Sequence, residues 1–314
     1  MNSHARVPSP ASTEPILERR PTGALRHVRP KQGVPASRRA LAAFLRNKIA
    51  VFGLCVLVVI ALLALSAPLL YPGDPLEMVA TPFVWPGQSW QFPLGTDSLG
   101  RDVAAGILHG GRVSLVIGIW ATIIGTAVGI LIGATAGYFG GWIDDLAMRF
   151  VELFQTIPPF ILLIVLVAIA QPSIGVMTIS IGIVSWPPLA RLVRAEFRSL
   201  RQKDFVVAAR SQGFGHGRII FHEILPNALP PIIVTASVMV ATAILMESAL
   251  SFLGLGDANQ VSWGSMIGEG REVLRTAWFL TAVPGGMIVI TVLALNLVGD
   301  GLNEALNPRL DKET

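Results

Sequence analysis

The chain has 314 residues, of which 52% are hydrophobic and only 14% are charged, and its mean hydropathy is +0.62. A soluble domain of this length could not bury so much apolar surface, so the composition excludes an ordinary soluble protein and predicts one that crosses a membrane several times. The formal net charge of +4 and the pI near 9.7 are attributed to membrane topology rather than to nucleic-acid binding.

Six apolar runs are each long enough to cross the bilayer hydrocarbon, which takes about 20 helical residues. They cover roughly residues 49–71, 113–137, 152–171, 174–192, 229–253 and 278–299. Backbone polar groups must be satisfied inside lipid, so the runs predict an all-α membrane protein with six transmembrane helices. The first run begins too late for a cleaved signal peptide and is expected to remain as the first transmembrane helix.

Lysine and arginine are distributed unevenly between the loops that join these runs. With the N-terminus in the cytoplasm, 20 of the 24 basic residues fall on the cytoplasmic side, as the positive-inside rule requires. Both termini are therefore predicted to be cytoplasmic, in a multi-pass protein of the cell inner membrane. We expect a largely disordered basic tail over 1–48, an extracytoplasmic loop over 72–112, a five-helix core over 113–303 and a cytoplasmic C-terminal tail over 304–314.

The loop over 72–112 contains several prolines and glycines, which prevent a long helix before Asp102. We expect Asp102 to start a short helix that leads toward Arg112. Trp85 and Trp90 also lie in this loop. They are consistent either with the membrane interface, where tryptophan is enriched, or with contact to a partner.

Glycine and proline recur at positions that affect helix packing. Gly125, Gly129, Gly133 and Gly137, here called the glycine row, are spaced by four residues, which lets another helix approach closely. Three proline pairs, Pro158-Pro159, Pro187-Pro188 and Pro230-Pro231, fall within or at the ends of apolar runs. Each pair removes backbone donors and is expected to bend its helix.

The loop over 193–228 contains the stretch "DFVVAARSQGFGHGRIIFHEILPN", residues 204–227. On a helix Val206, Ala209 and Arg210 share one face, and Gly213 then breaks the helix. A second short helix is predicted from Arg218 to Leu225, ending at Pro226. Small residues before a glycine turn allow another surface to approach the backbone, so the stretch is predicted to be a docking element.

This stretch resembles the EAA loop of permease subunits in binding-protein-dependent ABC importers. Ala208, Ala209, Gly213, Leu225 and Pro226 match that pattern, whereas Val207 stands where the pattern has glutamate. The resemblance implies that the loop forms the coupling helix held by an ATPase subunit. Val207 removes whatever polar contact the glutamate would make, but the framework of small residues and glycine remains.

Further motifs resemble the C-type permease subunit of dipeptide and oligopeptide importers. They are "FPLGTDSLGRD", "ESALSFLGLG" followed by "SWGSMI", and "LALNLVGDGLNEALNPR". The resemblance implies a type I ABC importer permease fold. It also implies three kinds of partner: a homologous second permease, two ATP-binding subunits and an extracytoplasmic substrate-binding protein. Nickel and oligosaccharide permeases belong to the same subfamily, so they remain alternatives to peptide cargo.

The sequence offers no catalytic machinery of its own. It lacks the G-x-x-x-x-G-K-[ST] motif that holds nucleotide phosphates, so ATP is expected to be hydrolysed on separate subunits. No nucleophile, base and orienting acid stand at recognisable spacings, and Cys55 is the only cysteine. The five histidines form no metal-ligand pattern, and His216 and His222 are expected to face water or lipid headgroups. The chain is therefore predicted to be no enzyme, with no cofactor or metal.

Most acidic residues near the predicted spans are expected to have structural roles. Asp144 and Asp145 are expected in a solvated turn, whereas Asp300 and Glu304 follow the last span and are expected to pair with Arg309 or a loop.

Glu247 is the exception, because a carboxylate inside an apolar helix is costly and marks either a pathway or a specific buried partner. We favour hydrogen bonding within the bundle over contact with a peptide's amino terminus. In a more distant alternative, an ion-coupled carrier acting alone, Glu247 would be the coupling group. A self-sufficient carrier has no need of the docking element at 204–227, which favours the importer.

Overall fold

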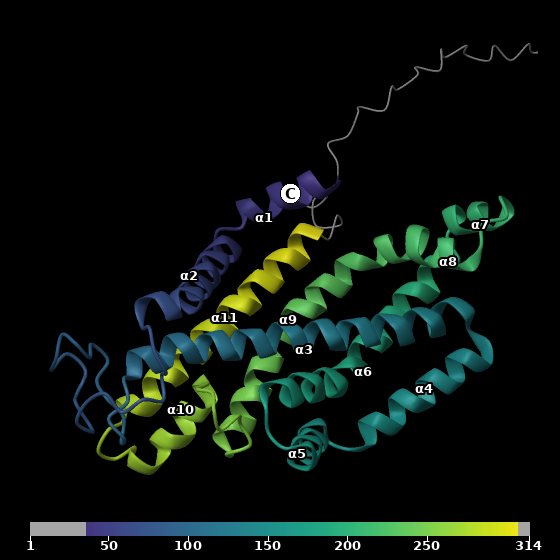
Figure 1. Cartoon of the computed structure of the whole chain (residues 1–314). Coiled ribbons are helices and arrows are strands. Elements are labelled where there is room, and N and C mark those ends of the chain that lie inside the picture. The colour runs from purple at the N-terminus through teal and green to yellow at the C-terminus, as the bar shows by residue number, and fades with distance from the viewer. Residues whose placement is uncertain (1–35, 307–314) are drawn as a thin grey trace, which may run out of the picture.

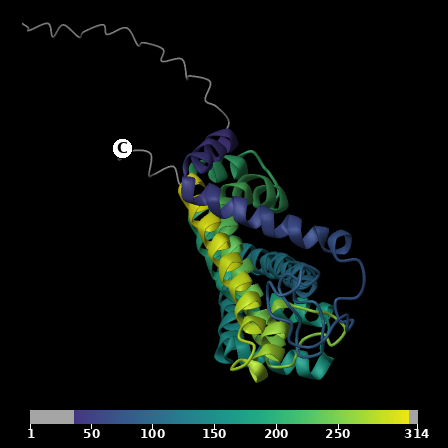
Figure 2. The same cartoon turned by 90° about the vertical axis from the view of Figure 1, so that its left-hand side faces the viewer.

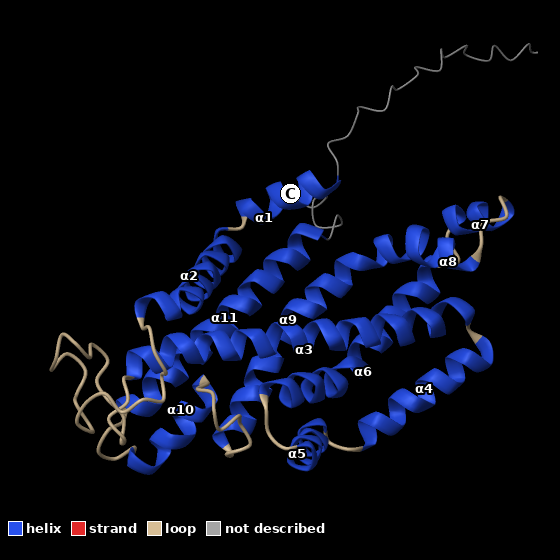
Figure 3. Ribbon diagram, in the orientation of Figure 1, coloured by secondary structure: helices blue, strands red, loops and turns tan. Residues whose placement is uncertain are grey.

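The computed structural model describes residues 36–306, which fold into helices with no strand among them (Figures 1 and 3). The elements are α1 (Ala36–Arg46), α2 (Lys48–Leu70), α3 (Val103–Phe139), α4 (Gly141–Thr156), α5 (Pro159–Ala170), α6 (Ile174–Leu200), α7 (Asp204–Ser211), α8 (His216–Arg218), the π-helix η1 (Ile219–Ile224), α9 (Leu225–Phe252), α10 (Trp263–Gly270), the 3₁₀-helix η2 (Arg271–Val273) and α11 (Phe279–Leu306). The predicted all-helical membrane fold is confirmed.

Five helices are long and apolar enough to cross a membrane. They are α2, α3, α6, the continuous helical stretch His216–Phe252 and α11. A sixth span exists only if α4 and α5 are taken as one broken segment, bent by 80°. The expectation of a single helix over 152–171 is therefore wrong. Ile157 and Pro158 each precede a proline, which disfavours the helical backbone, and both have extended ψ angles of 130° and 128°.

Helix α3 is longer than the predicted span 113–137 and begins at Val103. Asp102 caps it by accepting a hydrogen bond from the Ala104 N–H at 2.8 Å. No separate short helix ends near Arg112, because the glycines there serve packing rather than a break. A Cβ atom at Gly111 would lie 2.8 Å from the Trp263 ring, so this glycine lets α10 lie against α3.

The glycine row packs α3 directly against α6. A Cβ atom at Gly133 would lie 2.4 Å from the Ala190 carbonyl oxygen, and one at Gly137 would lie 2.6 Å from the Arg194 carbonyl oxygen. Side chains larger than hydrogen cannot fit there without separating the helices. The close helix contact predicted from the spacing is confirmed, and the partner lies within the same chain.

The two ends of the bundle differ in what they carry. The start of α2 with α1, the C-terminal end of α11, and α7 with α8 lie toward one end, whereas the loop over 72–102 and α10 lie at the other (Figures 1 and 2). The side-chain amide of Asn47 donates to the Glu304 carboxylate at 2.6 Å, which ties α2 to α11. Arg309, the other partner expected for Glu304, lies outside the described residues.

Part of the expected N-terminal tail is helical. Residues 36–46 form α1, and its Phe44 is buried against α11, where a Cβ atom at Gly301 would lie 3.2 Å from the Phe44 ring. The expectation of a largely disordered tail up to residue 48 therefore does not hold for this segment. Residues 1–35 lie outside the described part of the chain.

Candidate functional sites

The turn between α7 and α8 is built around Gly213. This glycine has φ +79°, a conformation that side chains disfavour, and a Cβ atom there would meet nothing within 4 Å. The Gly213 N–H donates to the Arg210 carbonyl at 2.9 Å, and the Phe214 N–H donates to the Ala209 carbonyl at 3.2 Å. This bonding pattern is a Schellman cap, so backbone conformation rather than crowding requires glycine at 213. The predicted sequence of helix, glycine turn and helix is confirmed.

The sequence predicts that the second short helix ends at Pro226, but in the structure it continues past this residue. The chain is helical without interruption from α8 through η1 into α9. In the π-helical turn the Leu225 N–H donates to the Ile220 carbonyl, five residues earlier. Pro226 directly follows this wider turn, which accommodates a residue that has no N–H to donate, so the helix continues past it. As a result the loop is mechanically continuous with a helix that is long enough to cross the membrane.

The six predicted coupling residues fall into two groups. Val207, Ala208, Gly213 and Pro226 are exposed on this chain, and Val207 is 52% exposed. Ala209 is only 5% exposed and lies with Val206 in a cluster that also contains residues of α3, α6 and α9, with Leu225 packed against it. Ala209 therefore supports the loop from inside, and the exposed residues of the loop include the apolar Phe205, Val207 and Phe221 beside polar and charged side chains such as Arg210 and Arg218.

The inner side of the loop contacts α3 through Tyr138. The Tyr138 hydroxyl lies 2.8 Å from Nδ1 of His216, and the Arg210 guanidinium lies over the Tyr138 ring at 5.4 Å. His216 and His222 are both exposed, as expected, although nothing in the sequence indicated the bond between His216 and Tyr138. Sequence reasoning did not single out Tyr138, because its partners lie more than 70 residues away.

Asp144 does not lie in a solvated turn. Its carboxylate is buried and accepts two hydrogen bonds from the Arg194 guanidinium, one of them from Nη2 at 2.7 Å. Asp145 is exposed, as expected. Gly140, with φ +69°, is the N-cap of α4, and the partner of Asp144 lies 50 residues later in the chain, in α6.

Glu247 is fully buried between α9 and α3. Its Oε2 accepts a hydrogen bond from Ser114 of α3 at 2.9 Å, and its Oε1 accepts one from Ser251 at 2.8 Å. Ser248 lies 3.4 Å from Oε2. The polar partners of the Glu247 carboxylate are therefore serine hydroxyls. It has no ion-pair partner among residues 36–306, where the only ion pairs are Arg101–Glu269 and Arg194–Asp144.

The motif "SWGSMI" forms the start of α10 and fixes it between two long helices. Ser262 and Ser265 form a capping box, the Trp263 indole N–H donates to the Ile107 carbonyl at 2.9 Å, and Trp263 is fully buried. A Cβ atom at Gly264 would lie 2.5 Å from the Ser248 backbone. These residues therefore join α10 to α3 and α9.

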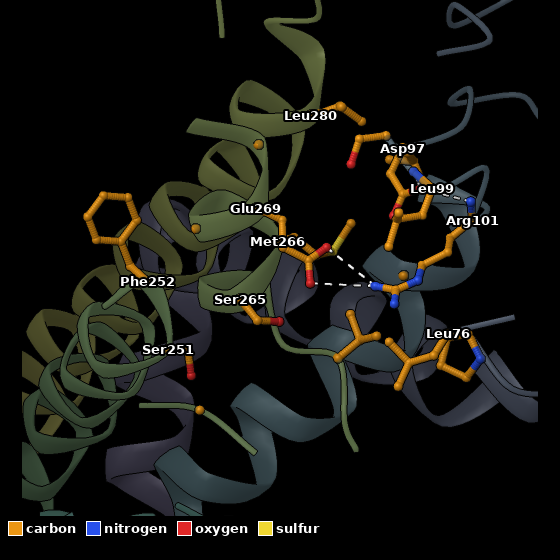
Figure 4. Close-up of a pocket in the computed structure, with 18 of the residues that line it drawn as sticks. Leu76, Asp97, Leu99, Arg101, Ser251, Phe252, Ser265, Met266, Glu269 and Leu280 are labelled. Carbon is orange, nitrogen blue, oxygen red and sulfur yellow. Dashed lines mark hydrogen bonds and ion pairs between the residues drawn. The ribbon is translucent and has the colours of Figure 1, made fainter. Parts of the chain in front are cut away.

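A cavity of about 530 Å³ opens at this end of the bundle, between the 72–102 loop, the start of α3, the end of α9 and α10 (Figure 4). Arg101 and Glu269 face each other across it, with Nη1 3.5 Å from the carboxylate. Partial burial raises the pKa of the Glu269 carboxyl, and the Arg101 guanidinium acts in the opposite direction. Within residues 36–306, no group of three or more His, Cys, Asp or Glu side chains is placed to hold a metal ion.

Several helices long and apolar enough to cross a membrane are typical of a multi-pass membrane protein. The chain belongs to the family of binding-protein-dependent transport system inner membrane components, whose model matches residues 129–312. Residues 36–86 match the N-terminal TM domain of oligopeptide transport permease C. The chain is therefore a multi-pass inner-membrane component of an ABC importer, and the resemblance seen in its motifs is confirmed.

Relatives cover nearly the whole chain. It is 40% identical over 274 residues to the dipeptide transport system permease protein DppC of Alkalihalophilus pseudofirmus, covering 87% of this chain and 90% of that protein. It is 34% identical over 287 residues to the oligopeptide transport system permease protein OppC of Bacillus subtilis, covering 90% and 92%. A solved chain of the MetNI methionine ABC transporter matches with a TM-score of 0.53 at 18% identity, covering 64% and 96%. That likeness supports the type I ABC importer permease fold.

Proposed function

We propose that this subunit carries dipeptides or oligopeptides across the inner membrane, using ATP hydrolysed on partner subunits. The observation that supports this most directly is the identity of 34–40% along most of the chain to permeases named for dipeptide and oligopeptide transport. In this proposal the chain hydrolyses no ATP itself and binds no cofactor.

The loop 204–227 is the proposed contact for an ATP-binding subunit. It exposes apolar side chains, Phe205, Val207 and Phe221, its turn is fixed by Gly213, and its second half continues into α9. Closure of an ATPase dimer would therefore move α9 directly. The complete importer contains a homologous second permease, two ATP-binding subunits and an extracytoplasmic binding protein. Both termini and this loop then face the cytoplasm, as the basic residues predict.

Substitution of Gly213 tests the coupling role. We expect Gly213→Arg to leave the membrane helices inserted, because the open space around Gly213 accepts a side chain without disturbing the bundle. The strained backbone and the bulky charge should spoil the docking surface, so ATP-driven uptake should fall to background. Gly217→Arg provides a matched comparison of the added charge, since Gly217 has open space and no positive φ.

Three quantities are measured on the same preparations: the amount of the variant in the membrane, its co-purification with the ATP-binding subunit, and ATP-driven uptake. Retained membrane insertion with lost uptake in Gly213→Arg, and a smaller loss in Gly217→Arg, is the expected result. Normal uptake by Gly213→Arg would mean that the loop merely connects α6 and α9.

Cargo is tested separately in a strain that lacks this gene. Uptake of labelled dipeptide should be lost in the deletion strain and restored by the intact chain. A growth defect confined to nickel limitation, with peptide uptake unchanged, would replace the peptide assignment by the nickel alternative. A defect confined to oligosaccharide uptake would point to the third cargo class instead.

A further inference from the structure

Helix α3 reaches the loop 204–227 in a different way from its neighbours. Helix α6 joins the loop through the chain itself, and α8 runs through η1 into α9. Helix α3 ends at Phe139, more than 60 residues before the loop begins, so any direct contact between α3 and the loop depends on side chains. Tyr138, in the last turn of α3, provides the polar contact, and the ring of the adjacent Phe139 lies 5.8 Å from the His216 ring.

Tyr138 contacts both short helices that flank the glycine turn. Its hydroxyl is hydrogen-bonded to His216 of α8 at 2.8 Å, and the two rings meet edge to face with centroids 5.6 Å apart. Its ring also lies under the Arg210 guanidinium of α7. Tyr138 is only 4% exposed, and a buried hydroxyl without a partner is costly. The bond to His216 therefore fixes the loop relative to the end of α3.

The rest of α3 extends from this contact to the opposite end of the bundle. The glycine row holds it against α6, Ser114 donates to Glu247 of α9, and the Ile107 carbonyl accepts the Trp263 indole N–H of α10. A single helix of 37 residues thus contacts the loop at one end and the walls of the 530 Å³ cavity at the other.

We propose that Tyr138 is a positioning residue that transmits movement of the loop 204–227 to α3 through its hydrogen bond to His216. This rests on the proposed function, because it requires ATP-binding subunits to move the loop. In this arrangement the loop drives three helices: α6 and α9 through the chain, and α3 through Tyr138. The competing explanation is that Tyr138 only fills space, in which case its hydroxyl has no effect on transport.

Removal of single polar groups distinguishes the two explanations. Tyr138→Phe deletes the hydroxyl and keeps the ring, and His216→Ala deletes the partner. His216→Asn keeps a hydrogen-bonding group near the position of Nδ1 and should restore much of the function. Tyr71→Phe is the matched control, because Tyr71 is the only other tyrosine and follows α2, far from the loop.

The readout is the number of labelled dipeptides transported per ATP hydrolysed. It is measured in proteoliposomes that contain equal amounts of the assembled importer. Tyr138→Phe and His216→Ala should each lower this ratio about three- to tenfold, the range expected for one neutral hydrogen bond. The double variant should be no worse than either single variant, because both remove the same bond. Tyr71→Phe should match the unmodified chain.

An unchanged ratio in Tyr138→Phe, or losses that multiply in the double variant, would overturn the proposal. The Gly213→Arg variant separates this failure from a failure of the proposed function. If Gly213→Arg abolishes uptake while Tyr138→Phe does not change the ratio, the loop couples but α3 is not driven through Tyr138. If Gly213→Arg also transports normally, the coupling role itself is wrong.

Discussion

At the scale of single residues, the pair of Asp144 and Arg194 shows how strongly one tertiary contact can change the environment of a side chain. Asp144 has an exposed acidic neighbour, yet its own carboxylate is buried in two hydrogen bonds to Arg194. Bidentate pairs of this kind are among the stronger polar contacts. Removing only one partner of such a pair is costly, because the other charge is left buried without a partner.

We therefore expect Asp144→Ala to destabilise the protein by about 1–3 kcal/mol, the cost of leaving a partly buried partner unsatisfied. Asp145→Ala, at the exposed neighbouring position, should change stability by less than about 0.5 kcal/mol. Thermal unfolding of the purified chain in detergent measures both. Equal midpoints for the two variants would show that the Asp144–Arg194 pair contributes no stability.

The residue scale also sets the limit of what the sequence could predict. Gly213 was placed correctly, because a glycine between two short helical patterns is a local signal. Tyr138, Ser114 and Arg194 were missed, because their partners lie 50 or more residues away in the chain. Nothing near them in the sequence distinguishes them from residues that line an ordinary packed helix.

At the scale of elements, α3 and α6 pack closely because the glycine row has no side chains to keep the two backbones apart. At Gly133 and Gly137 the two backbones approach so closely that an added Cβ atom would lie 2.4 and 2.6 Å from carbonyl oxygens of α6. Helix association in membranes relies on such packing because lipid is as apolar as the side chains. Each glycine of the row is therefore expected to be sensitive to the smallest possible enlargement.

We predict that Gly133→Ala costs about 1–3 kcal/mol of stability, the typical cost of overpacking, because its methyl group would lie 2.4 Å from the Ala190 carbonyl oxygen. Gly175→Ala in α6 is the control. A Cβ atom there meets nothing within 4 Å, and alanine favours helix, so this variant should be neutral or slightly stabilising. A thermal midpoint for Gly133→Ala at or above that of Gly175→Ala would contradict the packing argument.

Element boundaries were predicted less well than element existence, for identifiable reasons. Hydropathy located the spans but separated the span over 113–137 from the short helix expected to start at Asp102, whereas the two form one helix, α3. It merged α4 and α5, which the prolines at 158 and 159 separate. It also ended a helix at Pro226, although the π-helical turn before this residue lets the helix continue.

At the scale of the whole molecule, the chain connects a loop at one end of the bundle to a cavity at the other (Figure 1). Three long helices, α3, α6 and α9, extend between these ends and are linked by the glycine row and by the serine contacts of Glu247. This arrangement suits a subunit that converts movement at the loop into a change at the cavity. It gives no reason for the chain to transport by itself.

The central claim is that the chain moves peptide only when ATP-binding subunits engage its loop. The most direct test measures labelled dipeptide uptake into proteoliposomes that hold either the purified chain alone or the chain assembled with its partner subunits and binding protein. We predict no uptake by the chain alone under any ion gradient, and ATP-dependent uptake by the assembled importer. Uptake by the chain alone, driven by a proton or sodium gradient, would contradict the account and favour a carrier in which Glu247 is the coupling group.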